Sequence, residues 1–166
     1  MKLRLAALVS FTFTFLSVSC NAQPAFPQVL DAEYVKSIKV LSEKLTECRE
    51  SQKPVNVSSL SASMSKDQLK VVVEYFYSKT NFECSKSEYA DYLIKSHAAA
   101  AFLPKEANKV KDKIDFIVTS SEKYRWQSIA SYYALPEKAR RAAESENIFD
   151  KPFDLMSVLD QLNQID

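Results

Sequence analysis

Cys48 and Cys84 carry the clearest chemistry in this chain. A pair of cysteines in an oxidising compartment favours one disulfide over two free thiols. The alternatives lack partners, because neither cysteine belongs to a C-x-x-C motif and the chain has a single histidine to offer a metal. Closing a loop of this length is worth about 3 to 4 kcal/mol in the chain-entropy description. The sequence therefore predicts a structural disulfide and no metal or cofactor.

His97, Glu74 and Glu88 are the candidates for catalysis. His97 follows Leu93 by one helical turn, which places it at the edge of a core with a hydrogen-bond partner rather than beside a nucleophile. The two glutamates lie among apolar residues and could serve as the paired acids of a glycosidase. Acids on amphipathic helices are usually solvated, however, so a carboxylate-dependent hydrolase is the least favoured function.

Residues 1–22 have the three parts of a secretory signal. Two basic residues precede an uncharged apolar run over 5–18, and Cys20-Asn21-Ala22 supplies small residues at the spacing that a signal peptidase accepts. The apolar run is shorter than the roughly 20 residues of a membrane-spanning helix. We expect cleavage before Gln23 and a mature chain, 23–166, that is exported to the periplasm or outside the cell.

Cys20 leaves a second route to the envelope open. A cysteine that follows a small residue at the end of an apolar run is where bacterial lipoproteins are cut and acylated, and Ser19 suits this pattern. Ser17 stands where the lipoprotein motif favours Leu, and Leu16 lies one place too early. The alternative is therefore that the mature chain begins at a lipidated Cys20 and is an outer-membrane lipoprotein. This lipid is the only route by which we expect contact with a membrane.

The chain has no glycine among its 166 residues. Phosphate-binding loops, dinucleotide folds, nucleophile elbows and tight hairpins depend on glycine, so the sequence argues against all of them. Loss of Lys2 and Arg4 with the leader changes the formal net charge from +1 to −1, which leaves no basic excess for nucleic acid. The sequence predicts an all-α fold: a single-domain bundle of five to six helices with one disulfide.

Apolar spacing and capping signals divide the mature chain into helices. Cys48 is predicted on the buried face of the first helix, and 51–63 is predicted to be a polar loop. Asn56 in that loop begins a glycosylation sequon, which matters only in a eukaryotic host. Capping boxes that begin at Ser65 and Ser85 open two separate helices. The expected helices are 31–50 with Asp31 as N-cap, 66–80, 85–101, 104–135, 136–145 and a last one capped by Asp150.

Arg125, Trp126, Tyr132 and Tyr133 are the candidate partner-binding residues. Arg, Trp and Tyr are the residue types enriched at the centres of protein interfaces. They are also ordinary core material, so burial of these rings is the alternative.

Val71, Tyr75 and Tyr77 make the expected helix 66–80 apolar on nearly all sides. A helix of this kind belongs in a core, and Leu69, Val72, Val73 and Phe76 are predicted as its most buried residues. A groove that binds an apolar ligand at Val71, Tyr75 and Tyr77 is the alternative.

These patterns favour a non-enzymatic, exported protein-binding module, such as an inhibitor, immunity protein, adaptor or chaperone of a bacterial envelope. Its expected partner is another protein, because such a function needs only an exposed patch and no catalytic motif. The alternative function is a carrier that holds a small apolar ligand or a lipid within the helical bundle.

Overall fold

The described part of the chain is an all-α structure. A computed structural model describes residues 25–103 and 109–164, without the side chains of 109–115 and 117. Over these ranges the chain forms six helices, and a disulfide joins Cys48 to Cys84, which confirms both predictions. No helix in these ranges is long and apolar enough to cross a membrane. In chain order the helices are α1 (Phe26–Glu50), α2 (Ser58–Ser61), α3 (Lys66–Phe102), α4 (Lys109–Tyr133), α5 (Glu137–Ser145) and α6 (Leu155–Asn163). The expected leader 1–22, with Cys20, lies outside the described residues.

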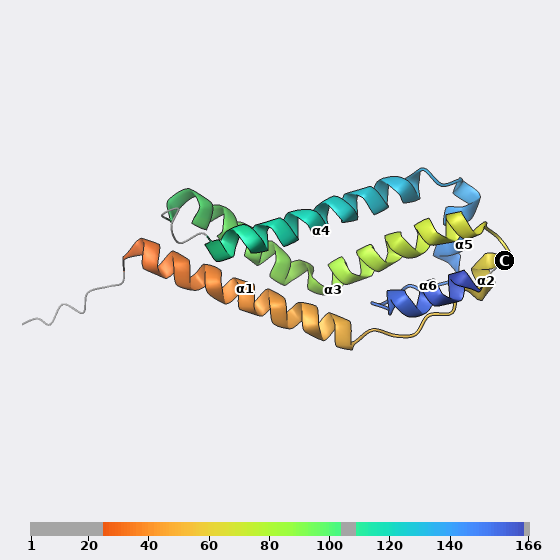
Figure 1. The fold of residues 1–166 in the computed structure, drawn as a ribbon, viewed down its shortest axis with the longest axis horizontal. Helices are drawn as coiled ribbons and strands as arrows, with labels where there is room; N and C mark the ends of the chain where they lie inside the picture. The colour runs from red at the N-terminus through yellow and green to blue at the C-terminus, as the bar shows by residue number, and fades with distance from the viewer. Residues whose placement is uncertain (1–24, 104–108, 165–166) are drawn as a thin grey trace, which may run out of the picture.

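α3 is the longest helix, with 37 residues, and all the other helices pack against it. α1 runs antiparallel to the second half of α3, since Phe26 meets Phe102 at one end and Cys48 meets Cys84 at the other. In Figure 1, α1 runs along the second half of α3 and α4 crosses α3 in this view, while α2, α5 and α6 gather around the end where α3 begins. α1 and α4 thus pack mainly on α3.

α3 is one helix where the sequence predicts two. Its start is confirmed, because Ser65 and Gln68 form the capping box: each side chain accepts a hydrogen bond from the backbone N–H of the other residue. The second predicted capping box is wrong, since the Ser85 hydroxyl donates to the Asn81 carbonyl inside the helix. Residues 81–84 contain no Pro or Gly to end the helix. The disulfide therefore ties α1 to the middle of α3, not to a connection between two helices.

Two helix starts also differ from the predictions. α1 begins at Phe26, so Asp31 lies inside the helix and does not cap it. Pro27 in the first turn favours this earlier start, because its fixed φ suits the helix and its missing N–H is not needed there. The last helix is capped by Asp154, whose carboxylate accepts a hydrogen bond from a backbone N–H of α6, and not by Asp150.

The remaining predicted boundaries are close to the observed ones. α4 ends at Tyr133, just before the expected end, and its expected start at Pro104 lies outside the described residues. α5 follows Pro136, which is its N-cap residue.

Two hydrophobic clusters lie along α3. The larger cluster surrounds the first half of α3, and all four predicted residues of that helix belong to it: Leu69, Val72, Val73 and Phe76. The smaller cluster lies between α1 and the second half of α3, around Tyr34, Leu41, Tyr92 and Ala99. The first half of α3 is thus held by α2, α5 and α6 and the second half by α1, with α4 packing on both clusters through Tyr132 and Val118.

The segment 51–63 is not the polar surface loop that the sequence predicts. Val55, Val57 and Leu60 are buried in the larger cluster. Gln161 of α6 fixes the backbone of this segment: its amide group donates to the Val55 carbonyl at 2.8 Å and accepts from the Val57 N–H at 3.2 Å. The buried backbone groups therefore have partners although they lie outside a regular helix.

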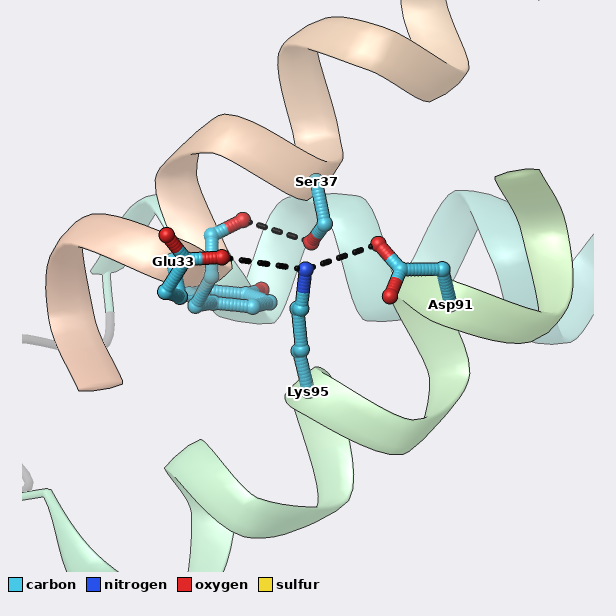
Figure 2. Close-up of polar contacts among 5 residues, drawn as sticks. Glu33, Ser37, Asp91 and Lys95 are labelled. Carbon is cyan, nitrogen blue, oxygen red and sulfur yellow. Dashed lines mark hydrogen bonds and ion pairs between the residues drawn. The ribbon is translucent and has the colours of Figure 1, made fainter. Parts of the chain in front are cut away.

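Lys95 links α1 to α3 between the smaller cluster and solvent (Figure 2). Its ammonium lies 3.2 Å from a Glu33 oxygen on α1 and 2.9 Å from an Asp91 oxygen one turn earlier on α3. The hydrogen bond to Asp91 is the main cause that raises the pKa of Lys95, and Glu33 raises it further. Beside this contact, the Ser37 hydroxyl donates to the Tyr34 carbonyl at 2.7 Å. The ion pair of Lys95 with Glu33 and the disulfide both tie α1 to α3.

Candidate functional site

One face of α4 presents a stripe of large side chains. Trp126, Ile129 and Tyr133 follow one another at steps of three and four residues, so they share a face of the helix. Trp126 is 60% exposed and Tyr133 is 61% exposed, with Ile129 half-buried between them. Tyr75 of α3 meets Tyr133 edge-to-face, with ring centroids 6.4 Å apart. Together with Arg125, these four residues form a surface that we call the aromatic face.

A groove of about 240 Å³ runs along the seam between α3 and α4 at the aromatic face. α3 contributes Tyr75, Lys79 and Phe82, which lie one turn apart. The groove is thus mainly aromatic and aliphatic, with charged groups along it. Its full lining is Tyr75, Ser78, Lys79, Phe82, Glu83, Arg125, Ile129 and Tyr133.

Arg125 is held in place from three sides. Its guanidinium donates to both carboxylate oxygens of Glu122, at 3.1 and 2.7 Å. The same guanidinium lies 4.2 Å from the ring centroid of Phe82 and 4.9 Å from that of Trp126. The hydrogen bonds from Arg125 are the main cause that lowers the pKa of Glu122. The ion pair therefore stays charged well below neutral pH, and it supports the exposed ring of Trp126.

Tyr132 does not belong to the aromatic face, contrary to the prediction that groups it with Tyr133. It is only 1% exposed and is part of the larger cluster. Its ring stacks on Tyr75 with centroids 3.8 Å apart, and its hydroxyl donates to Glu144 of α5 at 2.9 Å. Burial, followed by the bond to Glu144, raises the pKa of Tyr132 above its ordinary value. Its role is structural: it sets the position of Tyr75.

The three residues predicted for an apolar ligand are separated by the fold. Val71 packs half-buried against the larger cluster. Tyr75 faces the groove beside Tyr133, and Tyr77 points to the other side of α3, where its ring meets Phe153 at 5.8 Å. Of this set, only Tyr75 joins the predicted partner-binding residues.

A wider cleft of about 600 Å³ opens on the other side of the α3–α4 seam, between α1 and α4. Arg125 and Phe82 border both this cleft and the groove, so they form the wall between the two. Tyr89 lines the cleft, and burial followed by the nearby Glu122 carboxylate raises its pKa. The cleft's main apolar residues are Leu41 and Leu45 of α1, Tyr77, Phe82 and Tyr89 of α3, and Val118 and Tyr124 of α4.

The candidates for catalysis are not brought together. His97 is exposed on α3, although it lies one turn after the half-buried Leu93, so it is not held at the edge of the core as predicted. Glu74 and Glu88 are half-buried on α3 and line neither the groove nor the cleft. Within the described ranges, no three residues of the types His, Cys, Asp and Glu are grouped to hold a metal ion.

Lys79 and Phe82 are members of the groove that sequence reasoning missed. Together with Tyr75 they form a stripe at spacings of four and three residues on α3. That stripe crosses position 80, where the first of two predicted helices, 66–80, ends. The helical spacing from Tyr75 to Phe82 is the signal that could have found them, given one continuous helix.

Comparisons with known proteins give no match from which a function could be inferred, so a functional proposal rests on this geometry. No protein-family model matches the chain, and no curated protein and no solved structure compared with it gives a significant match.

Proposed function

We propose that this protein is a non-enzymatic, exported protein-binding module that docks its partner on the aromatic face. The observation that carries the proposal is the exposure of Trp126 and Tyr133 on one face of α4, two turns apart and beside a groove. A large exposed aromatic patch beside a recess is typical of an interface centre.

The support beneath these rings strengthens the proposal. Trp126 rests on Arg125, and Tyr133 contacts Tyr75, which is itself stacked on the buried Tyr132. Side chains held in this way lose little conformational entropy when a partner covers them, which favours affinity. The Glu122 carboxylate next to them has a lowered pKa, so it stays ionised near neutral pH and is unsuited to act as a general acid.

Two features support an exported location. The leader 1–22 has the pattern of a secretory signal, and Cys48 and Cys84 form the disulfide that an oxidising compartment permits. We therefore place the module in the periplasm or outside the cell.

The test compares two variants that remove exposed aromatic rings from the same helix. Trp126→Ala with Tyr133→Ala strips the aromatic face, and Phe116→Ala removes a ring that is 72% exposed elsewhere on α4. Each protein is cross-linked in an envelope extract of its host, and the captured proteins are identified by mass spectrometry. A partner retained by the wild type and by Phe116→Ala, but lost from the double variant, is the expected result. The same captured proteins in all three samples would rule out the aromatic face as the docking site.

A second candidate function rests on the cleft between α1 and α4. Its volume of about 600 Å³ falls in the range of small-molecule sites, and its lining is largely apolar. A carrier of an apolar ligand would use this cleft rather than the aromatic face. Val118→Trp fills the cleft, whereas Val40→Trp adds the same bulk to an exposed position of α1 outside it. Solvent extraction and mass spectrometry should find a co-purified ligand in the wild type and in Val40→Trp, but not in Val118→Trp.

A further inference from the structure

Two cations at the aromatic face have no carboxylate to pair with. The Lys79 ammonium lies 5.9 Å from the ring centroid of Tyr75, and the Arg140 guanidinium lies 5.5 Å from that of Tyr133. Neither side chain forms an ion pair with a carboxylate of the described residues. Both charges therefore lie against aromatic rings, and the Lys79 ammonium also lies 5.5 Å from the ring centroid of the buried Phe76.

The acids near the aromatic face are already engaged. Glu83 pairs with Lys86 at 2.6 Å, and Glu122 pairs with Arg125 at 2.7 Å. Glu144 accepts the hydroxyl of Tyr132 at 2.9 Å. That hydrogen bond comes from a neutral group and leaves Glu144 charged, so Lys79 and Arg140 exceed it by one positive charge. A complementary partner therefore carries negative charge.

We infer that the partner docks as an amphipathic helix whose apolar residues enter the groove and whose acidic residues meet Lys79 and Arg140. This inference rests on the proposed function, because it concerns the same surface. Trp126 and Tyr133 are seven residues apart, which is two helical turns, or about 10 Å along α4. A helix with apolar residues at positions i, i+3 or i+4, and i+7 matches that span, as in other helix-in-groove complexes.

The arrangement of the cations fits a helix better than a membrane surface. Lys79 lies on α3 opposite the middle of the Trp126–Tyr133 stripe, and Arg140 lies on α5 beyond its Tyr133 end. Two single charges, one in the groove and one beyond its Tyr133 end, can each meet one carboxylate of a partner. Recognition of an anionic membrane surface uses clusters of four or more basic residues instead.

The test uses two designed helical peptides with the same apolar face. One carries Glu and the other Lys at the flanking positions, and vesicles of phosphatidylglycerol and phosphatidylcholine serve as a third probe. Trp126 is the only tryptophan of the chain, so its fluorescence in the protein purified from its host reports binding at the aromatic face. We expect the acidic peptide to bind about tenfold more tightly than the basic one at low salt. The reason is that Lys79 and Arg140 pair with the Glu residues of the acidic peptide and repel the Lys residues of the basic one.

Charge variants separate this inference from the proposed function. Lys79→Glu with Arg140→Glu should reverse the preference between the peptides, and Lys79→Met with Arg140→Met should abolish it while keeping the packing of both stems. Circular dichroism checks that each variant is folded. Equal binding of both peptides would overturn the acidic-partner inference and leave protein binding standing. Binding to the vesicles alone, or to none of the three probes, would overturn the helix-docking inference, and the cross-linking experiment then decides the proposed function separately.

Discussion

Removal of the disulfide should cost this protein about 4 kcal/mol of unfolding free energy. The bond closes a loop with a sequence separation of 36 residues, and the chain-entropy relation for that length gives about 4 kcal/mol at 25 °C. Domains of this size typically have a total stability of about 5 to 15 kcal/mol. The double variant Cys48→Ala/Cys84→Ala should therefore remain folded, with a free energy of unfolding only slightly above zero.

The assay is urea unfolding followed by circular dichroism, with thermal unfolding as a second measurement. A loss of this size should lower Tm by about 10 °C. The wild type unfolded in the presence of a reductant is the control, because it lacks the bond but keeps both side chains. The two samples should agree apart from the small voids left by Ala at Cys48, which is only 1% exposed.

A measured loss below about 1 kcal/mol would refute this reasoning. It would mean that α1 and α3 already stay paired in the unfolded ensemble through their other contacts, such as Tyr34 with Tyr92 and Glu33 with Lys95. In that case the bond would have little chain entropy left to remove.

Three further predictions concern single side chains. Glu122→Gln should cost up to about 1 kcal/mol at neutral pH. The pKa of Glu122 in the folded protein lies below its ordinary value of 4.5. The loss of unfolding free energy should therefore have its full size above pH 4.5 and should vanish as the pH falls through the lower, folded-state pKa. Urea unfolding at a series of pH values measures this loss. Tyr132→Phe should cost about 1.5 kcal/mol in the same assay because it breaks the bond to a carboxylate, whereas Tyr133→Phe should cost less than about 0.5 kcal/mol. Gln161→Met should cost about 2 kcal/mol by leaving the Val55 carbonyl and the Val57 N–H without partners, and it should raise hydrogen exchange in that segment.

The elements that the sequence predicts well are those with a strong local signal. The Ser65–Gln68 capping box requires only its own side chains and the following turn, and it forms as expected. Ser85 and Glu88 have the same spacing but sit inside α3. Whether a capping signal is used depends on whether the preceding residues leave the helix, and here they stay in α3, where Phe82 packs against Arg125 of α4. That contact joins two helices and has no trace in local spacing.

The candidate site shows the same limit at the level of one residue. Tyr132 and Tyr133 are neighbours of the same type, and the sequence groups them on one surface. Adjacent side chains of a helix point about 100° apart, so only one of them can face α3 and α5. The ring of Tyr132 stacks on Tyr75 of α3 and its hydroxyl donates to Glu144 of α5, and Tyr133 is left on the surface.

The two candidate functions differ in how they depend on α1. The aromatic face is built from α3 and α4 alone, and its rings rest on Phe82, Arg125 and Tyr132. The cleft needs α1 as one wall, and the Cys48–Cys84 bond holds the end of α1 that carries Leu45 against α3.

Reduction of the disulfide should therefore weaken ligand binding in the cleft and leave the aromatic face unaffected. Under conditions where the reduced protein is still folded, binding to the aromatic face should be unchanged, as measured by Trp126 fluorescence with the acidic peptide. Retention of an apolar ligand in the cleft should fall, because the wall formed by α1 is freer to move away from α3. Loss of peptide binding on reduction would contradict the assignment of the aromatic face to α3 and α4, since the bond joins α1 to α3 and does not link α3 to α4. Ligand retention that survives reduction would instead argue that Leu41 and its neighbours hold α1 in place without help from the disulfide.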